Sequence, residues 1–240
     1  MAQHILLIME FLDEKIQRLY REGYKQKEIA RKVGFSQAHV SRLMRKFGMK
    51  TKGHSERHRK PIDLTPSPNL AYIVGALKGD GDIINNPKWR KYGLRLRVSS
   101  KIFAQSFRKA LQKQGLEPYM WFTENPHKGI WNVTADSQEF IIWYENLNLT
   151  EFLTTKEMQI SFLKGIYEAE GGYYYSSYAS IFNTDSALIS LIESILFHDL
   201  GFVPSVYCSK KGRKKPRYQI YIPTKETARF LALIKPCIKN

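Results

Sequence analysis

The chain has 240 residues, of which 43% are hydrophobic, so it can form a substantial buried core and wholesale disorder is excluded. Its 38 lysines and arginines outnumber its 22 aspartates and glutamates, and the net charge of +16 is typical of proteins that bind a polyanion. The sequence has no apolar run long enough for a bilayer, and its first residues lack a basic stretch and a small-residue cleavage site, so we expect neither a membrane segment nor a secretory leader. Cys208 and Cys237 are too few for a zinc site, and we expect core thiols rather than a disulfide.

Residues 13–47 carry apolar residues at helical spacing and predict three short helices. Gly23 and Gly34 interrupt the pattern, and Ser36 is a suitable N-cap for the third helix. The segment resembles the DNA-binding helix-turn-helix found in resolvases and many prokaryotic regulators. A three-helix bundle that serves only as scaffold or protein contact is the alternative. The residues expected to face DNA lie on the third helix and are Gln37, Ala38, Ser41, Arg42 and Arg45.

Residues 48–68 favour a linker, because Pro61, Pro66 and Pro68 prevent a long helix. The segment is also basic. It is either a solvated connector or a strap along the phosphate backbone or minor groove of DNA.

From Asn69 onward the order helix, strand, strand, helix, strand, strand, helix occurs twice. Ser67 and Pro68 begin the first copy, and a capping box from Thr154 to Glu157 precedes the second. In the first copy we predict helices at 69–80, 101–114 and from Ser137, with strands at 81–90, 92–99, 118–123 and 130–135. In the second copy, after its own leading helix, we predict strands at 172–176, 178–183, 203–208 and 217–222, and helices at 185–199 and from Thr224.

The leading helices of the two copies, in the segments 71–81 and 161–171, share one pattern of residue types. Each is mostly apolar, has a glycine in mid-helix and ends in a carboxylate followed by glycine. Gly75 and Gly165 each cost about 1 kcal/mol of helix stability relative to alanine, which indicates that two helices approach there backbone to backbone.

The acids that end these helices are Asp80 and Glu170. The C-terminal end of a helix carries a partial negative charge, so a carboxylate there is unfavourable unless a cation lies against it. The following glycines, Gly81 and Gly171, are expected to take the left-handed conformation. The pattern predicts two helices packed side by side that deliver two acids to one place.

These segments resemble the signature of the LAGLIDADG homing endonucleases. The resemblance covers about residues 69–240 and implies an α+β fold of two pseudo-symmetric αββαββα halves, here preceded by a small all-α helix-turn-helix domain. Two departures stand out, because Lys78 replaces the first acid of the motif in one copy and Glu170 replaces the usual final aspartate in the other. The expected domains are 1–47, the linker 48–68, 69–150 and 151–240.

The resemblance implies that Asp80 and Glu170 bind catalytic Mg²⁺, with Mn²⁺ as a substitute, and that the backbone carbonyls of Gly79 and Ala169 complete the coordination. By position after the second strand, Lys101 matches a basic residue that organises solvent around the metals in related enzymes. The second half has no lysine at the corresponding 183–185. Lys156, just before the second motif helix, is a further catalytic candidate.

Strand alternation predicts a polar, basic face on each sheet, suited to the major groove of DNA. The hairpin tip between the last two strands carries a run of basic residues expected to contact phosphate. Tyr173, Tyr174, Tyr175 and Tyr178 are expected mostly to pack in the sheet and core rather than to stack on bases. The residues predicted to bind DNA from the sheets and the hairpin are Arg95, Arg97, Asn132, Lys211, Arg213, Lys215, Arg217 and Gln219.

The leading hypothesis is a monomeric, magnesium-dependent endonuclease with a long asymmetric target in double-stranded DNA. If the source is prokaryotic, we expect it in the cytoplasm, associated with the nucleoid. A non-cleaving DNA-binding regulator and an RNA-splicing maturase on the same scaffold are the alternatives. The two intact acids favour the enzyme, because a regulator gains nothing from carboxylates that repel the phosphates of its own DNA.

Overall fold

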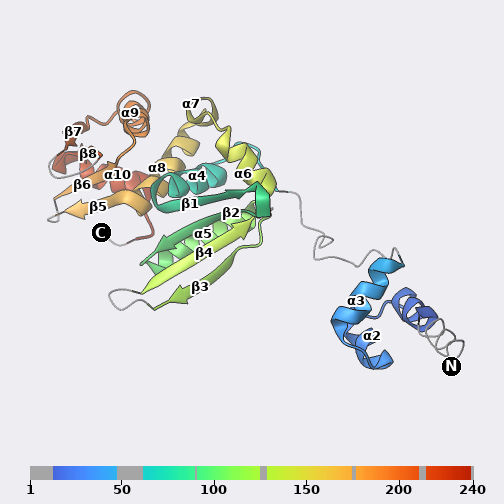
Figure 1. The fold of residues 1–240 in the computed structure, drawn as a ribbon. Coiled ribbons are helices and arrows are strands. Elements are labelled where there is room, and N and C mark those ends of the chain that lie inside the picture. The colour runs from blue at the N-terminus through green and yellow to red at the C-terminus, as the bar shows by residue number, and fades with distance from the viewer. Residues whose placement is uncertain are drawn as a thin grey trace, which may run out of the picture. The chain divides into compact units, whose positions relative to one another are not determined.

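The computed structural model describes residues 13–47, 62–89, 91–124, 129–174, 177–210 and 215–238 (Figure 1). The chain divides into two compact units, residues 1–59 and 60–240. Most of the predicted linker therefore lies outside the described residues. Among the helices of the described part, none is long and apolar enough to cross a membrane.

The N-terminal unit contains the three predicted helices, at 13–21, α2 (Gln26–Val33) and α3 (Gln37–Lys46). Gly23 and Gly34 both have positive φ, which allows the sharp turns between the helices. The Ser36 hydroxyl accepts a hydrogen bond from the His39 backbone N–H at 3.2 Å, as expected of the N-cap. The small core of this unit consists of Ile16, Leu19, Ile29, Ala30, Val40 and Met44.

The second unit contains the predicted repeat. Its first half has the elements α4 (Pro68–Asp80), β1 (Gly81–Asn86), β2 (Lys91–Val98), α5 (Lys101–Lys113), β3 (Tyr119–Thr123), β4 (Ile130–Asp136) and α6 (Gln138–Glu145). The short helix α7 (Leu149–Phe152) leads to the second half. That half has α8 (Lys156–Glu170), β5 (Gly171–Tyr174), β6 (Tyr178–Asn183), α9 (Ser186–Ser194), a π-helix (Ile195–Asp199), β7 (Ser205–Ser209), β8 (Arg217–Ile222) and α10 (Thr224–Ile234).

A few boundaries differ from the prediction. Strand β1 ends before a 3₁₀ turn that starts at Pro87, because proline has no N–H for a strand ladder. Helix α7 was not predicted. The predicted capping box is wrong, since the N-cap of α8 is Thr155, whose hydroxyl accepts from the Met158 N–H at 3.3 Å. Either of two adjacent threonines can cap a helix, and the sequence does not distinguish them.

Each half forms one four-stranded antiparallel sheet with the same strand order. Sheet A has the order β1-β2-β4-β3, and sheet B has the order β5-β6-β8-β7. The residue after each motif helix occupies the equivalent place, since Gly81 pairs with Leu96 and Gly171 pairs with Ile181. The structure is therefore an internal repeat with mixed α and β composition, as predicted.

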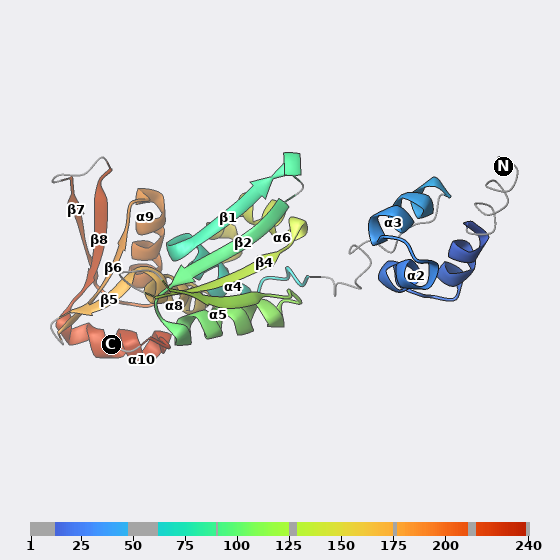
Figure 2. The same cartoon turned by 60° about the horizontal axis from the view of Figure 1, so that its bottom comes forward.

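The helices cover one face of each sheet, and the central helices α4 and α8 lie between the two sheets (Figure 2). The apolar residues of alternate strand positions face these helices and form one core that runs through both halves. We call the opposite faces the open face of sheet A and the open face of sheet B. The fold thus presents two open faces whose strands begin next to the ends of α4 and α8.

Helices α4 and α8 pack with their backbones in contact at two glycines. A Cβ atom on Gly75 would overlap the carbonyl oxygen of Phe162, and one on Gly165 would overlap the carbonyl oxygen of Tyr72. These atoms belong to the helical backbone and cannot move aside as a flexible side chain would. The predicted reason for the two mid-helix glycines is confirmed.

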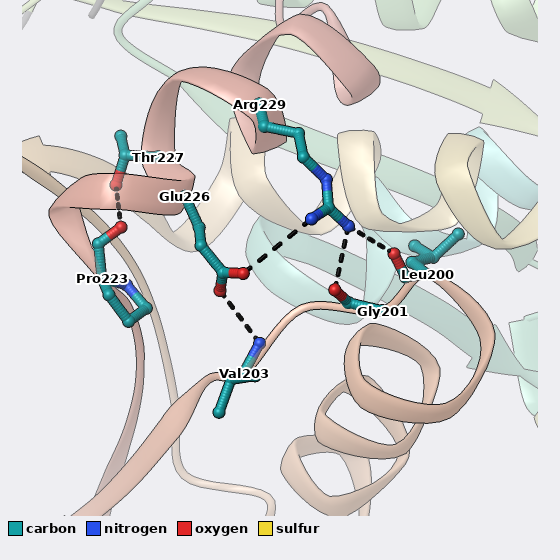
Figure 3. A network of polar contacts seen from close by, with 7 residues as sticks. All are labelled: Leu200, Gly201, Val203, Pro223, Glu226, Thr227 and Arg229. Atoms are coloured by element: carbon teal, nitrogen blue, oxygen red, sulfur yellow. Dashed lines mark hydrogen bonds and ion pairs between the residues drawn. The ribbon is translucent and has the colours of Figure 1, made fainter.

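In the second half, a polar network ties α10 to the connection that enters β7 (Figure 3). Arg229 donates to the carbonyl oxygens of Leu200 and Gly201 at 2.7 and 2.9 Å. Glu226 accepts from the N–H of Val203 at 2.9 Å and lies 3.9 Å from Arg229. These contacts fix the point from which the edge strand β7 starts.

The helix contact predicts the sign of a small mutation. Alanine in place of glycine in a helix normally stabilises a protein by about 1 kcal/mol. We expect Gly75→Ala and Gly165→Ala to do the opposite and to lower the free energy of unfolding by at least about 1 kcal/mol, because the new methyl group meets backbone. Urea unfolding followed by circular dichroism measures this. A rise in stability in both variants would contradict the backbone contact.

Candidate functional site

The two predicted acids lie at the adjacent C-terminal ends of α4 and α8. Asp80 is the last residue of α4 and is exposed, and Glu170 is the last residue of α8 and is half-buried. The preceding residues are in contact, because a Cβ on Gly79 would overlap the methyl group of Ala169 and lie 3.1 Å from Cγ of Glu170. The close packing of the helices therefore brings the two carboxylates to one place, as the sequence predicts.

The electrostatics of this place are unfavourable to two bare negative charges. Partial burial raises the pKa of Asp80 above its ordinary value. Burial also raises the pKa of Glu170, the negative charge of Asp80 raises it further, and the positive charge of Arg217 partly offsets both effects. The negative ends of the two helix dipoles act in the same direction as burial. A cation at this point would remove the repulsion.

The donor atoms at these helix ends fit a hard divalent cation. Two carboxylates are present, and the carbonyls of Gly79 and Ala169 belong to the last helical turns, whose carbonyl oxygens have no partner within the helix. Over the described ranges, no cluster of three or more histidine, cysteine, aspartate or glutamate residues could hold a metal by itself. The residues therefore suit an ion such as Mg²⁺, which accepts few protein ligands and keeps several waters.

The glycines after the acids have a different role from the one predicted. Gly81 has φ −88° and ψ 147°, and Gly171 has φ −89° and ψ 163°, so both are extended rather than left-handed. A side chain is excluded by space instead. A Cβ on Gly81 would lie 2.7 Å from the carbonyl oxygen of Leu77, and one on Gly171 would overlap the ring of Tyr167. The chain turns directly from helix into strand at these points.

The two candidate lysines differ in position. Lys101 begins α5, just after β2, and β2 runs toward the edge occupied by Asp80 because Leu96 pairs with Gly81. Its ammonium group lies 5.2 Å from the ring centre of Trp131, and its catalytic role stays a prediction. Lys156 is excluded from the site, because it begins α8 while Glu170 ends it. Fourteen residues at 1.5 Å per residue separate them by about 21 Å.

Asp82, which was not identified from the sequence, forms ion pairs with the two arginines of sheet A that we predict to contact DNA. It pairs with Arg95 across the two strands, and its carboxylate lies 2.8 Å from the guanidinium of Arg95 and 3.4 Å from that of Arg97. All three side chains are partly exposed. The signal that could have found this pairing is a third acid two positions after Asp80, at the start of a strand.

Two predicted DNA-binding amides have partners within the protein. Asn132 is buried, and its amide donates to the hydroxyl of Thr123 at 3.0 Å, so DNA contact would require this side chain to become exposed. Gln219 donates to the hydroxyl of Ser180 at 2.8 Å. For both residues, DNA contact stays a prediction.

The predicted basic contacts are placed only in part. The guanidinium of Arg217 lies 4.0 Å from the ring centre of Phe182, and Lys215 is exposed. Lys211 and Arg213 lie outside the described residues. On α3, the side chains of Gln37, Arg42 and Arg45 are exposed and Ser41 is half-buried.

The tyrosines of the second sheet do not all pack in the core. Tyr173 points to the covered side, because it pairs with the buried Ala179. Tyr174 and Tyr178 pair with each other on the open face, where their rings are stacked, so they pack on the sheet and not in the core. Tyr175 lies outside the described residues.

Two relatives from Methanocaldococcus jannaschii are similar to this chain. The uncharacterized protein MJ0314 is 34% identical over 197 residues, which cover 75% of this chain and 73% of the relative. The uncharacterized protein MJ0398 is 26% identical over 227 residues, which cover 89% and 81% of the two chains. No protein-family model matches the chain.

Solved structures with the same fold include the homing endonuclease I-DmoI, at a TM-score of 0.56 and 19% identity over 70% of this chain and 94% of that one. I-DmoI has also been solved with DNA and Mn, and that structure has a TM-score of 0.56 at 18% identity over 70% and 96% of the two chains. The N-terminal LAGLIDADG domain of DUF199/WhiA has a TM-score of 0.52 at 15% identity over 70% and 82%. The chain therefore has the LAGLIDADG fold.

The repulsion at the paired acids predicts how stability depends on charge and metal. In EDTA at pH 7, we expect Asp80→Asn and Glu170→Gln each to raise the free energy of unfolding by about 0.5 kcal/mol, as expected for a charge removed from the unfavourable end of a helix. Because both pKa values are raised in the folded state, the penalty is absent below the ordinary carboxyl pKa and complete above the raised values. The gain should therefore shrink as the pH falls from 7 toward about 4.

Addition of Mg²⁺ should raise the melting temperature of the wild type and leave the Asp80→Asn/Glu170→Gln double variant unchanged. Glu157→Gln, at the opposite end of α8, is the matched control and should respond to Mg²⁺ like the wild type. An equal response of the double variant would place the ion elsewhere.

Proposed function

We propose that this chain, which belongs to the same family as MJ0314 of Methanocaldococcus jannaschii and has the LAGLIDADG fold, is a divalent-metal-dependent endonuclease that cleaves a specific site in double-stranded DNA. The observation that carries the proposal is the pair of carboxylates, Asp80 and Glu170, which two packed helices hold together at the start of both sheets. Fold alone does not identify an enzyme, and the function rests on this site.

The known neighbours support the choice of substrate and cofactor. I-DmoI has been solved with DNA together with Mn or Ca, and a single-substitution variant of it has been solved with target DNA in the presence of Mg. The net charge of +16 suits a DNA-binding protein. For this chain, double-stranded DNA, Mg²⁺ or Mn²⁺ and a monomer with an asymmetric target are proposals that rest on the same site.

Within the site, Asp80 and Glu170 would hold the cation, with the carbonyls of Gly79 and Ala169 as further donors. A divalent cation bound by these residues would supply charge stabilisation on the scissile phosphate and would lower the pKa of an attacking water. The contact of α4 with α8 fixes the separation of the two carboxylates before DNA arrives. Arg217 would add positive charge on the side of Glu170, and Lys101, the first residue of α5, would add it at the edge of sheet A.

A non-cleaving regulator is the second candidate, and it needs no acids at this place. In that case Asp80 and Glu170 would repel DNA phosphates while also repelling each other, as the raised pKa of Glu170 indicates. A regulator under no other constraint gains from neutral residues at both positions. The paired charges therefore favour the enzyme.

To test cleavage, cleaved sites are first selected from a randomised duplex library in Mg²⁺. The cleavage rate is then measured on the selected site. We expect Asp80→Asn and Glu170→Gln each to lower the cleavage rate by more than about a hundredfold, because ligands matter at least as much as the residues that orient them. Both variants should bind the selected duplex as well as the wild type or better, since each loses a negative charge next to phosphate. Glu157→Gln should cleave normally. Full cleavage by the double variant would overturn the assignment, and binding without cleavage by the wild type would identify a regulator.

The N-terminal unit is proposed to contact DNA through α3. Arg42 and Arg45 are exposed there on one short helix, and the hydroxyl of Ser36 and the stacked rings of Phe35 and His39 order its beginning. The order of α2, a glycine turn and α3 is that of a helix-turn-helix, a motif whose second helix enters the major groove.

We expect Arg42→Ala and Arg45→Ala in the full chain to weaken binding of the target duplex and shorten its footprint at one end. Each phosphate interaction that a variant removes should reduce the slope of log affinity against log salt by about 0.9. Cleavage at saturating protein should not change. Arg18→Ala, which removes the same charge from the exposed side of the helix at 13–21, is the control. Footprints and salt slopes identical to those of the wild type would assign this unit another role.

A further inference from the structure

The open face of sheet B carries an unusual concentration of aromatic side chains. Residues that are directly paired across strands point to the same side of a sheet. Tyr174 pairs with Tyr178, and Gln219 of β8 pairs with Phe182 of β6 on one side and with Tyr207 of β7 on the other. Tyr221 lies two residues after Gln219 on β8 and therefore points to the same side. We call these five rings the aromatic platform, which consists of Tyr174, Tyr178, Phe182, Tyr207 and Tyr221.

The rings of the platform contact one another across the strands. Tyr174 is stacked on Tyr178 with ring centres 5.7 Å apart, and Tyr178 lies 4.8 Å from Tyr221. Tyr174 also meets Phe182 at 5.9 Å, and Tyr207 meets Tyr221 at 6.4 Å. The rings therefore form one continuous apolar surface rather than scattered exposed side chains.

This surface faces solvent. Tyr207 is 58% exposed and Tyr174 is 36% exposed, although the helices of the same half have buried the other side of the sheet. Gly172 makes room for the ring of Tyr174, because a Cβ at that position would lie 2.6 Å from a carbon of the ring. The ring of Tyr174 thus lies across β5, held in place on an exposed face.

Positive charge accompanies the rings. The guanidinium of Arg217 lies 4.0 Å from the ring centre of Phe182, within the platform. Lys210 follows the last residue of β7 and Lys215 precedes β8 by two residues, and both are exposed. An anionic occupant with flat, apolar parts matches this combination of charge and ring surface.

The open face of sheet A is different, although it has the same topology. Its central residues are Arg95 and Arg97 with Asp82, and its aromatic content in the described part is the stacked pair Tyr119 and Trp121 on the edge strand β3. Charged and hydrogen-bonding side chains read base edges in a duplex groove. Rings stack on the bases of a duplex only if the bases are first unstacked, which costs a few kcal/mol per step, but they stack readily on unpaired bases.

We propose that the aromatic platform of sheet B stacks on unpaired bases of a single-stranded nucleic acid, with Arg217, Lys210 and Lys215 at its phosphates. Four-stranded sheets that recognise single-stranded RNA use exposed aromatic side chains in the same way. The five rings do not include Asp80 or Glu170, and the variants that test this binding leave Arg217, which is shared with the cleavage site, in place. Binding can therefore be measured independently of cleavage.

The test measures binding in EDTA by fluorescence anisotropy with four labelled probes of equal length. These probes are a single-stranded DNA, a single-stranded RNA, a chain with the same phosphates but abasic residues, and a hairpin duplex. We expect the abasic chain to bind at least tenfold more weakly than the chains with bases, because it offers no bases for the aromatic side chains to stack on. A preference between DNA and RNA would identify which of the two the platform takes.

Two exposed rings provide the variants. Tyr207→Ala and Tyr174→Ala should each weaken binding of the single strands by about tenfold and leave the abasic chain unchanged. Tyr207→Phe should bind like the wild type, because the ring remains. Phe197→Ala is the matched control, since this ring is 53% exposed but lies on the π-helix after α9 rather than on the open face. Melting curves check that each variant is folded.

Equal affinities for abasic and base-containing chains, or no effect of Tyr207→Ala and Tyr174→Ala together, would overturn the proposal. Binding of the duplex alone would also overturn it and return sheet B to groove recognition. Self-association of the wild type that Tyr207→Ala abolishes, seen by sedimentation, would show that the platform is covered by a second copy of the chain instead. Cleavage assays do not enter any of these outcomes, so a failure here leaves the proposed endonuclease untouched.

Discussion

The backbone contact between α4 and α8 is the constraint on which the second unit depends. Gly75 and Gly165 let the helices approach until each meets the carbonyl oxygens of the other, and Gly79 continues the contact to the ends of the helices. A helix that lacks side chains on one stripe gains little from its own propensity, so its stability comes from this packing. The same approach places two carboxylates together, which costs electrostatic free energy. The fold therefore holds an unfavourable charge pair at the end of the contact between the two helices.

The acids that end the motif helices are equivalent, but the positions two residues earlier have diverged. In the second half Glu168 is buried, accepts a hydrogen bond from the hydroxyl of Tyr72 at 2.6 Å and another from the N–H of Cys237 at 2.6 Å. Burial and the charge of Glu168 raise the pKa of Tyr72, so its hydroxyl keeps the proton that it donates. In the first half Lys78 lies 5.1 Å from the ring centre of Tyr144. Glu168 thus connects the helix pair to the C-terminal segment, whereas Lys78 lies over an aromatic side chain.

Much of the fold and the acid pair could be predicted from the sequence, because they depend on local signals. Helical periodicity, the N-caps Ser36 and Ser67, and the repeated glycine and acid positions fix the elements and their order. The extended conformation of Gly81 could not be predicted, because it follows from the direct start of β1 after α4, and the need for glycine there follows from the lack of space next to Leu77. Lys156 was misplaced because sequence proximity to a helix does not say at which end of it the site lies.

Alternation of residues along a strand predicts the two faces of each sheet only in part. Alternation shows which residues share a side, and it placed Arg95 and Arg97 together on the open face. The cross-strand register also places Asp82 on this face, where its carboxylate forms ion pairs with both arginines. In sheet B the run of tyrosines fits either side, since tyrosine packs in a core or faces water with equal ease. Only the pairing of Tyr174 with Tyr178, opposite the buried Ala179 and Ile181, decides the side. Two halves with one topology can thus carry different recognition chemistry, because the buried residues of each strand fix the fold and leave the alternate positions free to differ.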